Sequence, residues 1–193
     1  MPRPSLAAKR KEEILDAFEQ CILEESLEAT SLEKLAEKAN MKRSILRHYI
    51  GNRDDIIVAL SERYQAYYSE LWRQTKEWLP ERNRMTVLIE MLFADRNQDY
   101  INKSIIGDAI YAQAKRLDQV RQHQLQAMQE AIQLLIGELN QAYPNAQEEK
   151  LHLIARGILS NYLHSEALLP LKFWEEIEQL KSVSLLLLKL LED

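Results

Sequence analysis

The fold is decided by one stretch of the sequence, residues 30–56, which reads TSLEKLAEKANMKRSILRHYIGNRDDI. Its apolar residues recur at helical spacing in two short runs, and Asn40 stands between them. Asn tolerates the left-handed backbone that a tight turn requires. The stretch therefore predicts two short helices, about 31–39 and 43–49, joined by a turn.

Polar residues in this stretch mark where helices begin. Thr30 and Glu33 have the spacing of a capping box, which predicts that Thr30 caps the first short helix. Asn52, followed by Asp54 and Asp55, predicts the start of a long helix, because Asn is a good N-cap and acids favour a first turn.

Outward from this stretch, the rest of the chain is also helical. A stripe that includes Ile14, Phe18 and Cys21 predicts a helix over 7–25, in which Cys21 is a core residue. Only four Gly and five Pro interrupt the 193 residues. We expect an all-α protein of about nine helices, with residues 1–52 as a helix-turn-helix domain and 53–193 as a helical regulatory domain. The later helices are expected over 53–79, 83–94, 100–113, 118–142, 147–166 and 171–191.

Charge is distributed unevenly along this acidic chain. Its net charge is −5, yet residues 1–53 hold ten Lys/Arg against nine Asp/Glu. The segment Lys38–Arg53 contains five cations and no acid. The arm before Glu12 is also basic and free of acids, with Arg3, Lys9, Arg10 and Lys11. Two concentrated basic patches indicate a small surface that contacts an anion such as DNA.

A pair of short helices with an outward cationic face suits the DNA major groove. The groove accepts one α-helix, and phosphates on either side need cationic or N–H donors. The helix-turn-helix pattern and the basic segment together predict binding to double-stranded DNA.

Residues 30–56 resemble the N-terminal signature of TetR-type transcriptional regulators. Thr30 and Ser31 match a Thr pair, and Leu35 with Ala36 match Ile-Ala. Further matches are Leu46 and Tyr49, with Ile50 in place of Phe and Arg53-Asp54 in place of Lys-Glu. The resemblance implies a dimeric regulator, most simply a repressor, that a small-molecule effector releases from its operator.

Four departures from the family pattern add charge or change the reading surface. Asn40 replaces the turn Gly, and Lys42 replaces the Ser that caps the recognition helix. Arg47 replaces a Tyr that reaches a phosphate in the family, and Ser44-Ile45 replace Gly-Thr. The operator sequence therefore does not follow from the resemblance.

We expect the second short helix to provide most of the DNA contacts. The residues expected to read bases are Lys42, Arg43, Ser44, Ile45 and His48, with Ile45 suited to a thymine methyl group. Those expected to contact phosphates are Thr30, Arg47, Tyr49 and Arg53, with the basic arm.

Dimerisation is expected because one such motif reads only a few base pairs. The last helix is too rich in leucine to bury every one on a single face, so we expect some to contact a second copy. The alternative is a buried helix in a monomer. The expected interface residues are Ile154, Ile158, Tyr162, Leu186, Leu187 and Leu190.

A ligand pocket among the middle helices is implied by the resemblance. The residues expected to line it are Trp72, Met91, Asp108, Tyr111 and Tyr162. Asp108 beside aromatic rings would suit a cationic ligand. The alternative places Asp108 on a solvent-facing side of its helix.

Other classes of protein find less support in the sequence. Glu149 and His152 have a metal-binding spacing without a second pair, and no phosphate loop or catalytic triad is evident. We expect no enzyme activity, no metal site and no cofactor. No segment has the pattern of a secretory signal or membrane span, so a cytoplasmic protein is expected. The alternatives are an all-α enzyme or small-molecule carrier whose basic patch binds an anionic substrate, and a helical adaptor that docks acidic partners.

Overall fold

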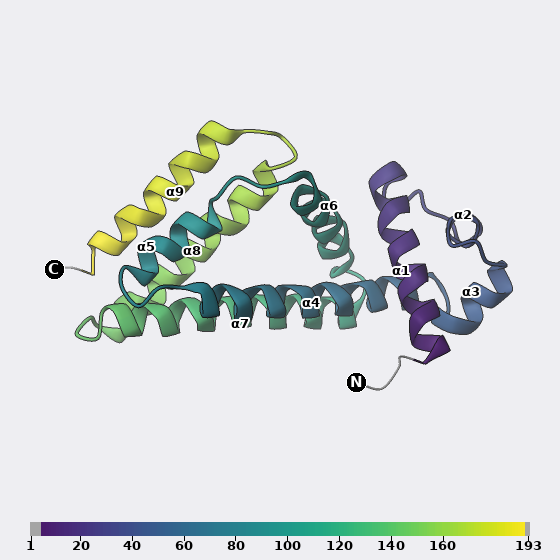
Figure 1. Cartoon of the computed structure of the whole chain (residues 1–193), viewed down its shortest axis with the longest axis horizontal. Helices are drawn as coiled ribbons and strands as arrows, with labels where there is room; N and C mark the ends of the chain where they lie inside the picture. Colours follow the sequence, from purple (N-terminus) through teal and green to yellow (C-terminus); the bar gives the residue numbers. More distant parts are fainter. Residues whose placement is uncertain (1–4, 192–193) are drawn as a thin grey trace. The chain divides into compact units, whose positions relative to one another are not determined.

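A computed structural model describes residues 5–191, and within that range the chain forms nine α-helices and no strand (Figure 1). This confirms the predicted all-α class, and the helix bounds agree with the sequence pattern to within a few residues. The helices are α1 (Leu6–Glu25), α2 (Leu32–Lys38), α3 (Arg43–Ile50), α4 (Arg53–Trp78), α5 (Arg84–Leu92), α6 (Gln98–Gln113), α7 (Asp118–Ala142), α8 (Glu148–Leu168) and α9 (Trp174–Lys189).

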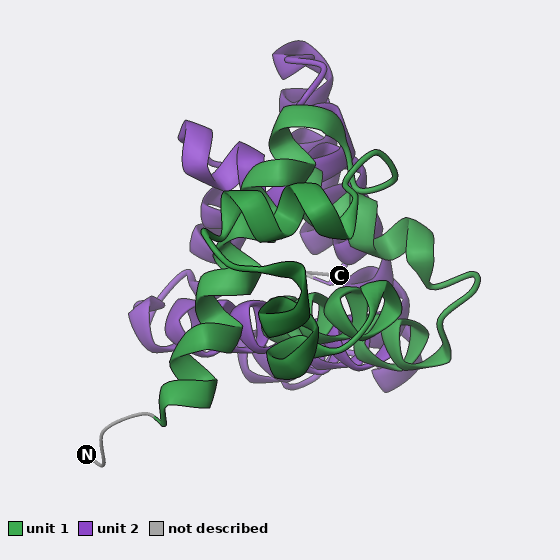
Figure 2. Cartoon of the chain, turned by 90° about the vertical axis from the view of Figure 1, so that its right-hand side faces the viewer, with its two compact units in different colours: residues 1–65, 105–124 green, residues 66–104, 125–193 purple. Residues whose placement is uncertain are grey.

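The chain divides into two compact units, coloured separately in Figure 2. Unit 1 comprises residues up to 65 together with 105–124, and unit 2 comprises 66–104 and the residues from 125 onward. Three helices, α4, α6 and α7, contribute residues to both units. The division expected at residue 52 differs from these units, because the helix-turn-helix is packed with the start of α4 and the end of α6.

Unit 1 contains the predicted three-helix head, in which α1, α2 and α3 contact one another. The buried side chains of α1 include Ile14, Phe18 and Cys21, as the helical stripe predicted. Leu35 of α2 and Leu46 of α3 are each no more than 1% exposed. Burial of such side chains stabilises a small helical head by about 1.5–3 kcal/mol each.

The first short helix is capped by Ser31, and the predicted capping box of Thr30 and Glu33 is wrong. The Ser31 hydroxyl accepts the N–H of Lys34 at 3.2 Å. Thr30 instead donates its hydroxyl to the carbonyl of Ser26 at 2.8 Å. Thr30 and Ser31 both carry a hydroxyl group that can cap a helix. The Thr30 hydroxyl is bound in the turn after α1, so the cap is formed by Ser31.

Unit 2 is built around a continuous apolar core to which α4, α5, α7, α8 and α9 contribute. Helices α8 and α9 run antiparallel, and α9 also contacts α5 (Figure 1). At Gly157 of α8, an added Cβ would lie 3.0 Å from a Leu187 methyl group of α9, so glycine permits the close approach of these helices. Glu138, which is 2% exposed, accepts a 2.7 Å hydrogen bond from Arg84 inside this unit.

None of the helices in the described range has the length and apolar content to cross a membrane. In the same range, His, Cys, Asp and Glu side chains form no cluster of three or more that would hold a metal ion.

Candidate nucleic-acid interface

The turn between α2 and α3 has the geometry that the sequence predicted. Asn40 adopts a left-handed φ of 51°, and the N–H of Met41 donates to the carbonyl of Ala36 at 2.8 Å. This bond closes the end of α2 and directs the chain into α3. Leu46 and Ile50 then anchor α3 in the head, because both are buried.

The outward side of α3 holds all five residues expected to read bases. Lys42, Arg43, Ser44, Ile45 and His48 are exposed, and Ile45 keeps 45% of its surface accessible. No side chain caps the start of α3 at Lys42, so its first N–H groups remain open. The helix can therefore offer N–H groups, cations and one apolar side chain to a groove.

The cations of α2 and α3 differ in whether the chain already neutralises them. Lys34 and Lys38 of α2 form ion pairs with Glu25 and Glu24 of α1, and Arg43 pairs with Glu33. The hydrogen bond to Glu24 raises the pKa of Lys38.

Lys42 and Arg47 are exposed and form no ion pair with any residue in the described range. These two cations are the ones that the chain leaves available to phosphates.

Two of the residues expected to contact phosphates, Thr30 and Arg53, have internal hydrogen-bond partners in unit 1. Thr30 is 2% exposed, with its hydroxyl bound to Ser26. Arg53 donates to the carbonyls of Thr30 and Leu27, the latter at 2.5 Å. Its guanidinium group ties the start of α4 to the segment between α1 and α2.

The remaining expected phosphate contacts differ in accessibility. Arg47 is exposed, whereas Tyr49 is half-buried and lies edge-on to His48 with ring centroids 5.3 Å apart.

The basic arm lies partly within the described residues. Arg3 lies outside the described residues. Lys9 and Arg10 pair with Glu13, while Lys11 pairs with Glu62 of α4. These cations belong to α1 and are balanced by acids of α1 and α4.

Contacts from the end of α6 to the head were missed by sequence reasoning. Gln113 donates to a Glu28 carboxylate oxygen at 3.2 Å, and Arg116 pairs with Asp54 at 2.7 Å. Ser61 and His123 share a 2.6 Å hydrogen bond that joins α4 to α7 within unit 1. Nothing in the sequence spacing predicts such pairs, because the partners are 62 to 85 residues apart.

A cavity of about 200 Å³ in unit 2 contains three of the five residues expected to line a ligand pocket, namely Trp72, Met91 and Tyr162. Asp108 and Tyr111 do not line it. The buried face of α6 is formed by Ile106 and Ile110, which leaves Asp108 and Tyr111 exposed. The full lining is Leu71, Trp72, Gln74, Thr75, Trp78, Met91, Leu92, Arg96, Tyr100 and Tyr162.

The residues expected at a dimer interface fall into two groups. Ile154, Ile158 and Tyr162 are at most 5% exposed and pack into the core of unit 2, so they are unavailable to a second chain. Leu186 of α9 and Leu190, which directly follows this helix, are 58% and 48% exposed. Leu187 is half-buried against Gly157.

Comparison with known proteins places this geometry in a recognised fold. No protein-family model matches the chain. Over 117 residues, 60% of the chain, the sequence is 25% identical to the HTH-type transcriptional regulator PksA of Bacillus subtilis strain 168, and the match covers 56% of that protein.

Two solved structures are similar over nearly the whole chain. A TetR transcription regulator from Haloarcula marismortui ATCC 43049 has a TM-score of 0.78 at 14% identity, covering 93% of this chain and 96% of that one. The multidrug binding protein EbrR, complexed with imidazole, has a TM-score of 0.67 at 16% identity and covers 96% of each chain. The chain therefore has the fold of TetR-type transcriptional regulators, as the resemblance of residues 30–56 predicted.

Proposed function

We propose that this protein is a sequence-specific DNA-binding transcriptional regulator without enzyme activity that acts in the cytoplasm. The observation that carries the proposal is the outward side of α3, where Lys42 and Arg47 are exposed without an acidic partner in the described range. An exposed, unpaired cation on a helix that fits the major groove contributes more to DNA affinity than a paired one, because no internal ion pair must first be broken.

Within α3 the side chains divide by role. Arg43, Ser44, Ile45 and His48 read base edges, while Arg47 contacts the phosphate backbone. Lys42 stands at the start of the helix and serves both surfaces. Tyr49 is half-buried, and its phenol hydroxyl contacts the phosphate backbone of the DNA.

Dimerisation is proposed through the exposed apolar side chains of α8 and α9. Leu153 of α8 is 65% exposed, and Val183, Leu186 and Leu190 recur along one side of α9. A two-fold dimer through this surface would present two heads to half-sites about one helical turn apart.

The dimer is tested by sedimentation of full-length variants. Leu186→Glu is expected to shift the protein to monomer at micromolar concentration. Leu125→Glu, which changes a leucine 46% exposed on α7, is the matched control and is expected to stay dimeric. A dimeric Leu186→Glu protein would remove α9 from the interface.

Control by a small molecule is proposed for the cavity in unit 2. Helix α6 begins near this cavity, which Tyr100 lines, and ends at Gln113, which is bonded to Glu28 of the head. A ligand that favours one position of α6 would therefore bias the head between two positions. Repression by occlusion of a promoter, with release by the ligand, is the simplest output.

The regulator proposal is tested by selecting duplexes from a random-sequence pool with the full-length protein, followed by titration in excess competitor at two salt concentrations. We expect one enriched sequence with two-fold symmetry, bound about 10³-fold or more tightly than competitor. If no sequence is enriched after repeated rounds, the DNA proposal fails and a basic patch for an anionic small-molecule substrate takes its place.

A further inference from the structure

The cavity of unit 2 carries a single formal charge on its lining, the guanidinium group of Arg96. None of its lining residues is acidic. Asp108, the acid that would have favoured a cationic ligand, lies instead on an exposed side of α6. The charge preference expected from the sequence is therefore reversed, because a cation would meet Arg96 without a compensating carboxylate on the lining.

Most N–H donors of Arg96 have no partner among the residues that the structure describes. Its Nη2 donates to the carbonyl of Leu92 at 2.6 Å, and its Cζ lies 4.3 Å from the centre of the Tyr100 ring. Among the residues that the structure describes, no carboxylate pairs with it. A guanidinium group has five N–H donors, so most of them remain for a ligand. A carboxylate is the acceptor that matches this fork best.

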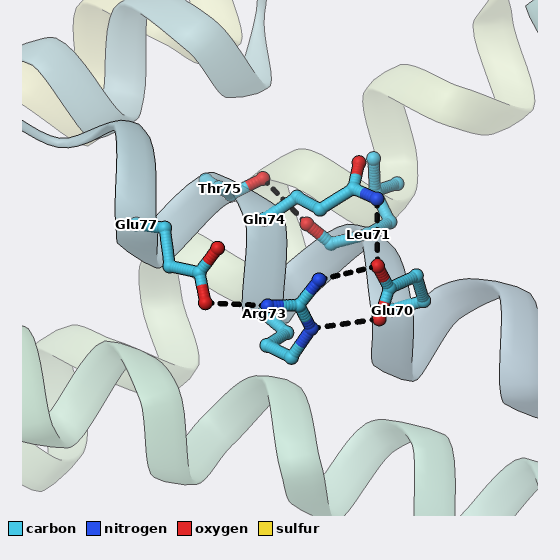
Figure 3. A network of polar contacts seen from close by, with 6 residues as sticks. All are labelled: Glu70, Leu71, Arg73, Gln74, Thr75 and Glu77. Carbon is cyan, nitrogen blue, oxygen red and sulfur yellow. Dashed lines mark hydrogen bonds and ion pairs between the residues drawn. The ribbon is translucent and has the colours of Figure 1, made fainter.

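Other polar groups on the lining are already engaged by α4 itself, as Figure 3 shows. Gln74 donates its amide to Glu70 at 2.7 Å, and Thr75 donates its hydroxyl to the carbonyl of Leu71 at 2.8 Å. Glu70 also binds Arg73, which lowers the pKa of Glu70 to about 2 and keeps it ionised. Recognition of a polar ligand group therefore falls mainly to Arg96 and to the tyrosines.

Two tyrosine hydroxyl groups form the second polar feature of the lining. The Tyr100 and Tyr162 oxygens are 2.9 Å apart. Burial raises the pKa of both phenols, and the negative charge of Glu166 raises them further, so both stay protonated. One hydroxyl proton closes the bond within the pair, and the other has no acceptor in the described range. It is available to a ligand oxygen.

The remaining walls are aromatic or aliphatic. Trp72 is 8% exposed and lies edge-on to Tyr162, with ring centroids 5.8 Å apart. Met91 and Leu92 complete the apolar side. The volume of about 200 Å³ suits a small ring, since a dry cavity of about 150 Å³ already holds benzene.

We propose that this cavity binds a single-ring aromatic carboxylate. The ring packs against Trp72 and Met91, and the carboxylate accepts hydrogen bonds from Arg96 and the tyrosine pair. The role of such an acid as the effector rests on the proposed regulatory function, whereas its binding does not.

The ligand class is tested by calorimetry on the full-length protein without DNA, using three planar probes of nearly equal size. Benzoate is anionic, benzamide is neutral and benzamidine is cationic. Benzoate is expected to bind at least about tenfold more tightly than benzamide, because charge-assisted hydrogen bonds are about twice as strong as neutral ones. Benzamidine is expected to bind more weakly still. Equal binding of the three probes, tighter binding of benzamidine, or binding of none at millimolar concentration would overturn the proposal.

Variants locate the source of the preference. Arg96→Gln is expected to reduce the ratio of benzoate to benzamide affinity to about one. Arg73→Gln is the matched control, because Arg73 lies on a helix that lines the cavity but is held by Glu70 and Glu77 outside the lining (Figure 3). It is expected to keep the wild-type ratio. A preserved ratio in a folded Arg96→Gln protein, or an equal loss in both variants, would exclude Arg96 as the binding group.

Separate readouts distinguish the ligand from the function. If benzoate binds in the expected order and also weakens binding to the selected duplex, both proposals are supported. If it binds in that order while no duplex is ever selected, the ligand class stands and the regulator proposal fails.

Discussion

Arg47 and Arg53 lie close together in the sequence, at the end of α3 and the start of α4, yet they serve different ends. Arg53 turns back to the carbonyls of Leu27 and Thr30 and holds the head together. Arg47 remains exposed, with no ion pair in the described range. The difference shows that the cations of a basic segment do not all belong to one binding surface. Internal hydrogen bonds and ion pairs already engage some of them.

The largest difference expected between the two arginines is in their effect on the free energy of unfolding. Arg53→Ala removes charged donors from three carbonyls, so it should lower the free energy of unfolding by about 2–4 kcal/mol. Arg47→Ala, the matched control, should change it by less than about 0.5 kcal/mol, as for other exposed residues. Urea denaturation of both variants measures the difference. Equal stabilities would mean that the Arg53 hydrogen bonds contribute nothing to the head.

The reactivity of the Cys21 thiol gives an independent measure of how much Arg53→Ala destabilises the head. The thiol is 1% exposed, and burial raises its pKa, so the native head should react slowly with a thiol reagent. In Arg53→Ala the reaction should accelerate by about 30-fold or more, because each 1.4 kcal/mol of lost stability raises the open population tenfold. Labelling at the wild-type rate would contradict a looser head.

A smaller effect is expected on base preference. Arg43→Ala should relax discrimination at one or two base pairs by about 1–3 kcal/mol, while affinity for non-specific DNA changes little. Competition titrations against single-base variants of the selected duplex measure this. If every sequence weakens alike, Arg43 contacts phosphates and reads no base.

The smallest expected effect comes from Glu33, which pairs with Arg43. Glu33→Gln should tighten DNA binding by about two- to fivefold, because exposed ion pairs are worth little and an acid beside the groove is removed. Glu37→Gln, on the same helix and with no side-chain partner in the described range, is the control for general charge. A loss of affinity in Glu33→Gln would show that the acid orients Arg43 for DNA.

Local pattern was sufficient to predict the helices but not the partners of their polar side chains. The periodic apolar stripes of α1 and α2 and the left-handed Asn40 follow from short-range rules, and the structure confirms them. Whether Thr30 or Ser31 caps α2 depends on which of the two hydroxyl groups donates to the carbonyl of Ser26.

Long-range pairing explains why the internal partners of some predicted site residues do not follow from the sequence. Arg53 binds carbonyls 23 and 26 residues earlier, which no spacing rule reveals. The sequence does not show which side of α6 faces the core, so it leaves both the pocket and the solvent-facing position open for Asp108. The sequence therefore predicted which side chains lie on the outward side of α3, but not which side of α6 carries Asp108.

The central claim is that Lys42 and Arg47 are the cations left for DNA, and the salt dependence of binding tests it most directly. Affinity for the selected duplex is measured over a range of salt for wild type, Lys42→Ala/Arg47→Ala, and Lys34→Ala/Lys38→Ala as the matched pair on α2.

We predict that losing Lys42 and Arg47 from both protomers of the proposed dimer reduces the slope of log affinity against log salt by about 3.6, since each of the four phosphate contacts contributes about 0.9. Losing Lys34 and Lys38, which are paired with Glu25 and Glu24, should change the slope by clearly less. Equal reductions in the two double variants, or an unchanged slope in the first, would contradict the account.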